Sequence, residues 1–180
     1  ASSFSPKAAI VYKPFEKTSL RTSVGKAFRP PTVYELYRTW TTSGGVTYAG
    51  NPDLKPETTT SWDIGIEQGL WKGAKIKAAY FENYMKDLIY RKTVSPTYRE
   101  SINAGKAESK GVEIEAEQRF DKWLRLFANF TYTYAKIKEN DAKPETEGKR
   151  LTNMPERMFN AGVEFEKGLF FASLTGRYVL

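Results

Sequence analysis

The segment that begins at Gly111 alternates apolar and charged side chains with a period of two. Its apolar residues are Val112, Ile114, Ala116 and Phe120, and between them stand Glu113, Glu115, Glu117 and Arg119. In a helix, a step of about 100° per residue would spread the three glutamates around the cylinder and break any apolar stripe. In a strand they share one face. The segment is therefore predicted to be a β-strand with one apolar and one charged face.

The same alternation recurs along the chain and predicts an all-β protein of eight strands. The predicted strands are residues 7–13, 18–27, 58–69, 74–90, 111–120, 124–134, 159–166 and 170–178. No helix longer than a couple of turns is needed, although Pro31 to Tyr37 could form one turn within a loop.

Short and long connections alternate strictly between these strands. The short ones are residues 14–17, 70–73, 121–122 and 167–168, and the long ones are roughly 28–57, 91–105 and 139–155. An antiparallel up-and-down sheet gives this order when all tight turns lie at one end and all long loops at the other. Outer-membrane barrels are built in this way, and a tilted membrane strand needs about 9–11 residues. The prediction is an antiparallel up-and-down transmembrane β-barrel segment of about eight strands.

A soluble β-sandwich is the alternative, because its strands also have one apolar face. Two features favour the membrane barrel. The opposite face carries Glu, Arg, Lys or Asn on nearly every strand, as a wet lumen requires. Aromatic residues also cluster at strand ends, where an interfacial girdle would lie, as with Trp62, Trp71, Phe120 and Trp123.

Composition excludes several other classes. The 4 Trp, 11 Tyr and 11 Phe supply more buriable area than a disordered chain would have. The chain has no Cys and no His, so disulfides, thiol chemistry and the commonest metal ligand and general base are missing. Its longest apolar stretches are about five residues, whereas a membrane helix needs roughly 18. The start at Ala1 shows no targeting segment.

Four motifs then give the chain a family resemblance. They are Phe28 to Tyr37 (FRPPTVYELY), Asn51 to Glu57 (NPDLKPE), Ala104 to Glu113 (AGKAESKGVE) and Asn153 to Arg157 (NMPER). In this order and at these spacings they resemble the Phe-Arg-x-Pro box, the Asn-Pro-x-Leu-x-Pro-Glu box and two strand-entry motifs of the TonB-dependent outer-membrane receptors. Any one of these motifs alone would be weak, but the four together are strong.

The resemblance implies properties that the alternation does not show. The family forms a barrel of about 22 strands in the bacterial outer membrane, plugged by a separate N-terminal domain and energised through TonB. Neither a plug nor a TonB-binding segment is visible in residues 1–180. The chain is therefore expected to be a partial barrel domain over residues 1–180, from the C-terminal half and without its last strands. Alone, it should form an open sheet with two free edges.

The loop of residues 28–57 is the best candidate for ligand binding. Loops on a rigid scaffold commonly carry recognition, and aromatic and arginine side chains make good ligand anchors. The candidate residues are Arg29, Tyr34, Tyr37, Arg38, Trp40 and Tyr48. The alternative, which the sequence does not exclude, is that Phe28 and the prolines fold the loop inward as a structural brace.

Two other groups of charged residues indicate neither catalysis nor nucleic-acid binding. The row of Glu113, Glu115 and Glu117 is expected to be lumen wall paired with Arg125 and lysines, so catalysis is not predicted. The net charge of +7 is spread among acidic residues without a nucleic-acid motif, which argues against nucleic acid as a partner. Loop cations that attract an anionic ligand, or that contact outer-membrane lipid and lipopolysaccharide phosphates, fit better.

The leading hypothesis is a non-enzymatic outer-membrane receptor that takes up a scarce metal chelate, with no resident cofactor or metal. Its partners would be the chelate, outer-membrane lipid and lipopolysaccharide, and TonB through the missing N-terminal region. The interval between the first two boxes contains tyrosines but no His, which weakens haem as the ligand. The ranking is ferric siderophore first, corrinoid second and haem third. The competing hypothesis is a stand-alone eight-stranded barrel or sandwich with a structural or adhesion role.

Overall fold

The computed structural model describes residues 4–152 and 154–180, so Ala1, where the sequence showed no targeting segment, and Asn153 of the fourth motif lie outside it. Its long strands are β1 (Lys7–Phe15), β2 (Thr18–Arg29), β5 (Glu57–Gly69), β6 (Ala74–Ser95), β7 (Tyr98–Phe120), β8 (Leu124–Asn140), β9 (Arg157–Lys167) and β10 (Phe170–Val179). The shorter elements are α1 (Val33–Tyr37), β3 (Trp40–Thr41), β4 (Thr47–Ala49) and the 3₁₀ helix η1 (Pro144–Thr146).

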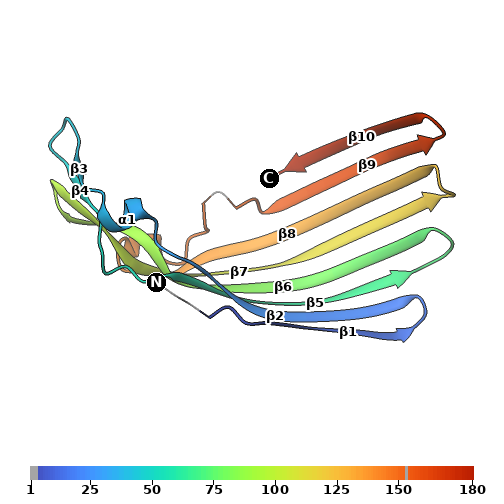
Figure 1. The fold of residues 1–180 in the computed structure, drawn as a ribbon, viewed down its shortest axis with the longest axis horizontal. Coiled ribbons are helices and arrows are strands. Elements are labelled where there is room, and N and C mark those ends of the chain that lie inside the picture. The colour runs from blue at the N-terminus through green and yellow to red at the C-terminus, as the bar shows by residue number, and fades with distance from the viewer. Residues whose placement is uncertain (1–3, 153) are drawn as a thin grey trace.

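The eight long strands form one antiparallel sheet in which neighbours in sequence are neighbours in space. The order is β1-β2-β5-β6-β7-β8-β9-β10, which confirms the predicted up-and-down sheet (Figure 1). Within the described residues, β1 pairs only with β2 and β10 only with β9, so the sheet is open, as expected. No helix in the described part of the chain is long and apolar enough to cross a membrane.

The turns β1–β2, β5–β6, β7–β8 and β9–β10 lie at one end of the sheet, on the right of Figure 1, and α1 with the β3–β4 hairpin lies at the other. Three of these turns use the left-handed backbone region, with φ of 79° at Gly73, 51° at Asp121 and 63° at Gly168. Glycine adopts this region without steric cost, which is why it stands at two of the turns. The four predicted tight turns therefore share one end of the sheet, as expected, but the other end is not made of long loops alone.

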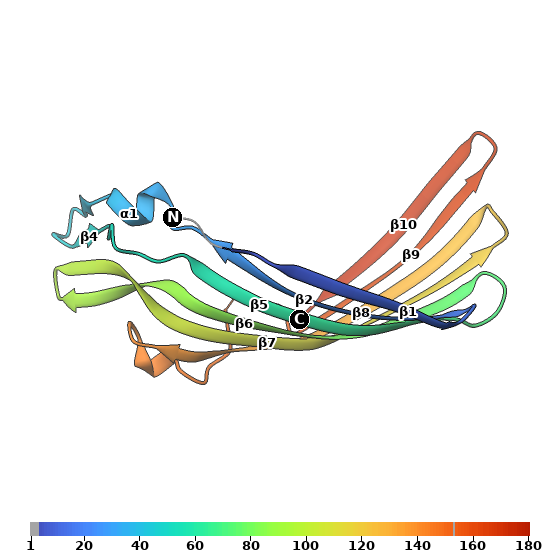
Figure 2. The same cartoon turned by 60° about the horizontal axis from the view of Figure 1, so that its bottom comes forward.

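One predicted loop is wrong. Residues 91–105 were expected to be irregular, but β6 continues to Ser95 and β7 begins at Tyr98, so only residues 96 and 97 connect them. Figure 2 shows this ribbon extending beyond the shorter strands at the loop end. The alternation that marks the other strands is weaker here, because Lys92 and Glu100 interrupt the apolar row of Val94, Tyr98, Ile102 and Ala104. η1 and α1 lie on opposite faces of the sheet (Figure 2).

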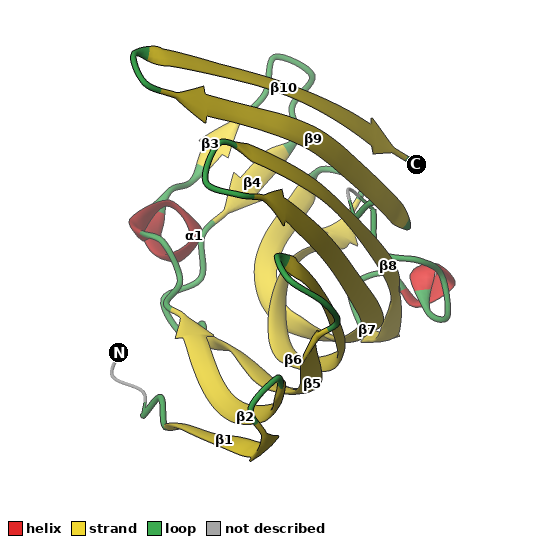
Figure 3. Ribbon diagram, turned by 90° about the vertical axis from the view of Figure 1, so that its right-hand side faces the viewer, coloured by secondary structure: helices red, strands yellow, loops and turns green. Residues whose placement is uncertain are grey.

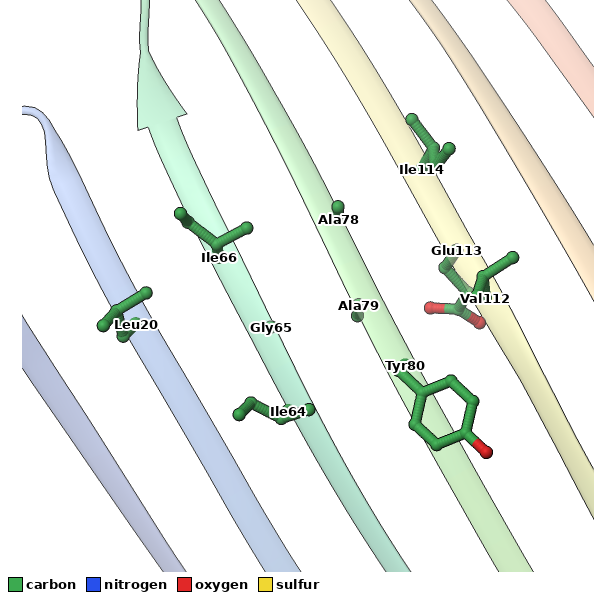
Figure 4. A pocket seen from close by; sticks show the side chains of 10 residues that line it. All are labelled: Leu20, Ile64, Gly65, Ile66, Ala78, Ala79, Tyr80, Val112, Glu113 and Ile114. Carbon is green, nitrogen blue, oxygen red and sulfur yellow. The ribbon is translucent and has the colours of Figure 1, made fainter.

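The two faces of the sheet differ in chemistry as predicted. One face carries a cross-strand row of Ile66, Ala78 and Ile114. Around Ala78 it forms a shallow apolar hollow of 460 Å³ between the larger side chains of Ile64, Ile66 and Ile114 (Figure 4). Exposed isoleucine side chains are favoured in contact with hydrocarbon and disfavoured in contact with water. A row of them is therefore typical of the lipid-facing side of a barrel.

The opposite face carries a ladder of ion pairs. Glu117 is 7% exposed and accepts from Arg119 Nε and Arg125 Nε at 2.8 Å each, with Lys75 Nζ at 3.6 Å. Glu115 pairs with Lys77 at 3.4 Å. The predicted pairing is confirmed for Glu115 and Glu117, although Glu117 is buried by its partners rather than solvated. Glu113, the third glutamate of the row, forms no ion pair with a described residue.

Candidate ligand-binding site at the loop end

The sheet is curved, and α1 with the β3–β4 hairpin lies on its concave side (Figure 3). Arg29, at the end of β2, contacts α1 through Glu35 and shares the face of Arg21 and Ser23. Because cross-strand partners point to one side, this face continues through Glu67 and Lys77 to Glu115. The charged face is therefore the concave face, which would line the lumen of a closed barrel. The loop of residues 30–56 lies over this face at the end of the sheet opposite the four tight turns.

The short helix α1 begins with a complete capping box. Thr32 Oγ1 accepts from Glu35 N at 3.2 Å, and Glu35 Oε2 accepts from Thr32 N at 2.7 Å. These two bonds satisfy backbone donors that a helix start leaves free. The loop also returns to the helix, since Asn51 N donates to Glu35 O at 2.9 Å. A five-residue helix is thus held in place by its own cap and by the second box.

Arg29 is the centre of a brace that we define as Arg29, Glu35, Glu57 and the backbone of Ile89. Its Nε donates to Glu57 Oε2 at 2.6 Å, and its Nη1 and Nη2 donate to Glu35 at 3.1 and 3.2 Å. Glu57 Oε1 accepts from Ile89 N at 2.8 Å. Burial alone would raise the pKa of Glu35, but the hydrogen bonds from Arg29 and Thr32 outweigh it and lower that pKa.

The second box is pinned to β7 by two asparagines. Asn51 Nδ2 donates to Ser101 O at 3.1 Å. Asn103 accepts from Lys55 N at 2.7 Å and donates to Lys55 O at 2.9 Å. Leu54 between them is 7% exposed. These side-chain bonds take the place of a backbone hydrogen-bond ladder between the second box and β7. They fix the position at which the loop re-enters the sheet.

Three aromatic rings meet in this fixed loop, two of them stacked and the third tilted against the stack. The ring centroids of Trp40 and Tyr48 lie 4.8 Å apart with planes 9° from parallel, because β3 and β4 pair at these two residues. Tyr34, from α1, lies against Trp40 at 5.2 Å and 59°. Aromatic pairs of this kind stabilise by about 0.5–1.5 kcal/mol beyond the area they bury.

Three arginines cover these rings. Arg38 lies 4.6 Å from the centroid of Tyr34, and Arg91 lies 4.8 and 4.9 Å from those of Trp40 and Tyr48. Arg99 lies 5.4 Å from Tyr48 and donates from Nη1 to its hydroxyl at 3.0 Å. We call these six residues the loop cluster: Tyr34, Arg38, Trp40, Tyr48, Arg91 and Arg99. None of the three arginines forms an ion pair with a carboxylate in residues 4–152 or 154–180.

The structure brings four of the six predicted ligand residues together and places the other two, Arg29 and Tyr37, elsewhere. Tyr34, Arg38, Trp40 and Tyr48 meet in the loop cluster. Arg29 belongs to the brace, which is the structural role left open for this loop. Tyr37 is 66% exposed and stacks on no ring or guanidinium in the described part of the chain.

Sequence reasoning missed Arg91 and Arg99 as members of this site. They stand in the segment that was predicted to be a separate loop. The parallel pairing of β4 with β7, which places Tyr48 opposite Arg99, brings them to the rings. A short parallel pairing between two loops leaves no periodic signal in the sequence, so no pattern could have found it.

Comparison with known proteins assigns the fold to a family. The family model described as TonB dependent receptor-like, beta-barrel, matches residues 1–180. The chain therefore belongs to the TonB-dependent receptors, as its four motifs indicated. Barrels of this family reside in the bacterial outer membrane, and the family is one of transport receptors rather than enzymes.

Three relatives illustrate the match. The iron-regulated outer membrane virulence protein of Vibrio cholerae serotype O1 is 28% identical over 92% of this chain and 27% of its own length. The heme/hemopexin utilization protein C of Haemophilus influenzae is 26% identical over 89% of this chain and 25% of its own. The ferric enterobactin receptor PfeA (G324V mutant) of Pseudomonas aeruginosa superposes with a TM-score of 0.73 and 20% identity, over 96% of this chain and 27% of that one. The chain thus spans about a quarter of each relative.

Proposed function

We propose that residues 1–180 are part of the barrel domain of a receptor that takes up a scarce metal chelate across the outer membrane. The loop cluster is the observation that carries this proposal. It places three adjoining aromatic rings and three arginines at the loop end of the curved sheet, where a solute from outside the cell would arrive. Aromatic and arginine side chains dominate the affinity of binding sites generally.

The ligand we propose is a ferric siderophore, ahead of a corrinoid and of haem. The names of the relatives support iron compounds as a group, since one is iron-regulated, one is named for heme and one for ferric enterobactin. Among the arguments against haem, the chain has no His to bind its iron, and Tyr48 is already engaged by Arg99. In a siderophore or corrinoid complex the chelator already supplies the donor atoms around the metal, so no protein side chain has to coordinate it.

The proposed partners follow from the family and the surface. TonB would act through a region N-terminal to this segment, and the apolar face of the sheet would contact outer-membrane lipid and, above it, lipopolysaccharide. No enzymatic step is proposed for the glutamate row, because Glu115 and Glu117 are already paired with lysine and arginine. The competing hypothesis of a closed eight-stranded module receives no support, because β1 and β10 lie at opposite edges of the sheet.

Binding to the intact receptor tests the proposal. Quenching of tryptophan fluorescence should report tight binding of a ferric siderophore and weaker binding of a corrinoid and of haem. Trp40→Ala should weaken siderophore binding at least about tenfold, as loss of a central aromatic anchor does, whereas Trp71→Ala, in the turn at the far end of the sheet, should not. Tight haem binding that disappears in Tyr37→Phe or Tyr48→Phe, without a response to ferric siderophores, would overturn the proposal.

A further inference from the structure

The loop cluster carries uncompensated positive charge. Arg38, Arg91 and Arg99 gather on three adjacent rings, and none of them forms an ion pair with a described carboxylate. Four other arginines are paired, as Arg29 is with Glu35 and Glu57 and as Arg125 is with Glu117 and Glu164. Arg21, Arg157 and Arg177 also form no ion pair with a described residue, but they do not gather at one place as the three cluster arginines do. Arginine keeps its charge at any physiological pH, so these three cannot relieve their repulsion by losing a proton.

One arginine in the cluster also has an unused donor. Arg99 Nη1 donates to the Tyr48 hydroxyl at 3.0 Å, but its Nε is buried and has no hydrogen-bond partner. A buried N–H without an acceptor is unfavourable, and natural structures rarely leave one. An acceptor oxygen from outside the chain reaches this atom only when the side chains that cover it move aside.

The position of the arginines fits an anion as well. Arg91 Cζ is 4.8 and 4.9 Å from the centroids of Trp40 and Tyr48, which stack 4.8 Å apart, so this guanidinium lies beside the stacked pair rather than over one ring face. Arg38 lies near Tyr34 and, at 5.4 Å, near Trp40. Each guanidinium has forked N–H donors, which match paired, negatively charged oxygens.

Chelate classes differ in the charge they would bring to this cluster. Three doubly charged catecholates around Fe(III) leave the complex anionic, with adjacent oxygens on flat aryl rings. Three singly charged hydroxamates only neutralise the iron, and their backbone is aliphatic. A corrinoid presents mainly neutral amides. Haem requires a protein side chain that coordinates its iron.

Building on the proposed function, we infer that the loop cluster selects an anionic aryl chelate, of the ferric catecholate class, over neutral hydroxamate chelates. The arginines supply the charge preference, and the rings supply flat surfaces for the aryl groups.

The test compares two probes on the full-length receptor, a ferric tris-catecholate and a ferric tris-hydroxamate, by fluorescence quenching at low and high salt. The catecholate should bind at least about tenfold more tightly, and its affinity should fall as salt screens the arginines. Arg91→Gln should lower catecholate affinity roughly tenfold, and Arg91→Lys, which keeps the charge but loses the fork, should recover part of it. Lys122→Gln, in a turn at the far end of the sheet, serves as the matched control.

The outcomes separate the two proposals. Equal affinity for both chelates, tighter hydroxamate binding or a catecholate affinity that ignores salt would overturn the charge inference while leaving chelate uptake intact. Binding of neither chelate, with none of haem or a corrinoid, would overturn the proposed function itself. The wild-type preference and its salt dependence decide the question even if an arginine variant fails to fold.

Discussion

Arg29 Nε donates to Glu57 Oε2 at 2.6 Å and so joins the residue where the loop leaves β2 to the residue where it enters β5. The same guanidinium holds Glu35 of α1, and Glu57 also accepts from the backbone of Ile89. A loop of 27 residues (30–56) is thereby closed at its base, so that its tip can hold the rings in one arrangement.

Loss of this brace should loosen the loop without unfolding the sheet. We expect Arg29→Gln to destabilise the loop by about 1 kcal/mol, since the Arg29 side chain is 46% exposed and solvent weakens its ion pairs. Hydrogen exchange of residues 33–49 should become faster, while β5 to β8 stay protected. Lys26→Gln, on the same strand and without an ion pair in the described residues, is the control. Unchanged exchange in Arg29→Gln would show that the brace is not what orders the loop.

The brace should also depend on pH. The pKa of Glu35 lies below its usual value of 4.5 in the folded protein, so the folded state favours the ionised carboxylate. The resulting stability is present in full above the unfolded pKa and is lost as pH falls through the lowered one. Exchange in the loop, corrected for its intrinsic pH dependence, should therefore be constant near neutral pH and rise only below about 4.5. In Arg29→Gln the onset should move to higher pH, and an unmoved onset would contradict this assignment.

Gly50 lets the loop pass close to α1. A Cβ at this position would lie 2.8 Å from the backbone of Leu36 and from Tyr37 N, which are backbone atoms that cannot rotate away. Gly50→Ala should therefore cost about 1–3 kcal/mol and displace Tyr34, weakening chelate binding. Gly44→Ala, where the nearest heavy atom is 4.0 Å away, should be nearly neutral. Thermal unfolding and ligand titration of both variants give the comparison, and equal behaviour would argue against close packing at Gly50.

The lumenal wall offers a matched pair of glutamates. Glu117 is 7% exposed and faces Lys75, Arg119 and Arg125, whereas Glu113, on the same face of β7, forms no ion pair with a described residue. Glu117→Gln leaves partly buried cations unpaired and should destabilise the barrel by about 3 kcal/mol, while Glu113→Gln should cost less than about 1. The temperature at which the receptor loses its compact electrophoretic mobility measures both. Similar losses in the two variants would mean that the ion pairs contribute little.

Where the chain crosses the membrane, the sequence was sufficient to predict the fold. Lipid on one side and water on the other force a period of two, as in Val112 to Phe120, and tight turns such as the one at Gly168 separate the strands. Outside the membrane the prediction failed. Arg91 to Gly105 continues the same two strands, but Lys92 and Glu100 interrupt its apolar row, so the alternation is too weak to mark a strand.

The sequence by itself determined the strands, their order and the loop that carries Tyr34, Arg38, Trp40 and Tyr48, because each of these follows from local pattern or turn chemistry. Only the tertiary structure decided that Arg91 and Arg99 join those rings while Arg29 does not. Tyr48 and Arg99 are 51 residues apart and meet through the short parallel pairing of β4 with β7. Such a contact depends on where two loops are held in space, and no periodicity in either segment records it.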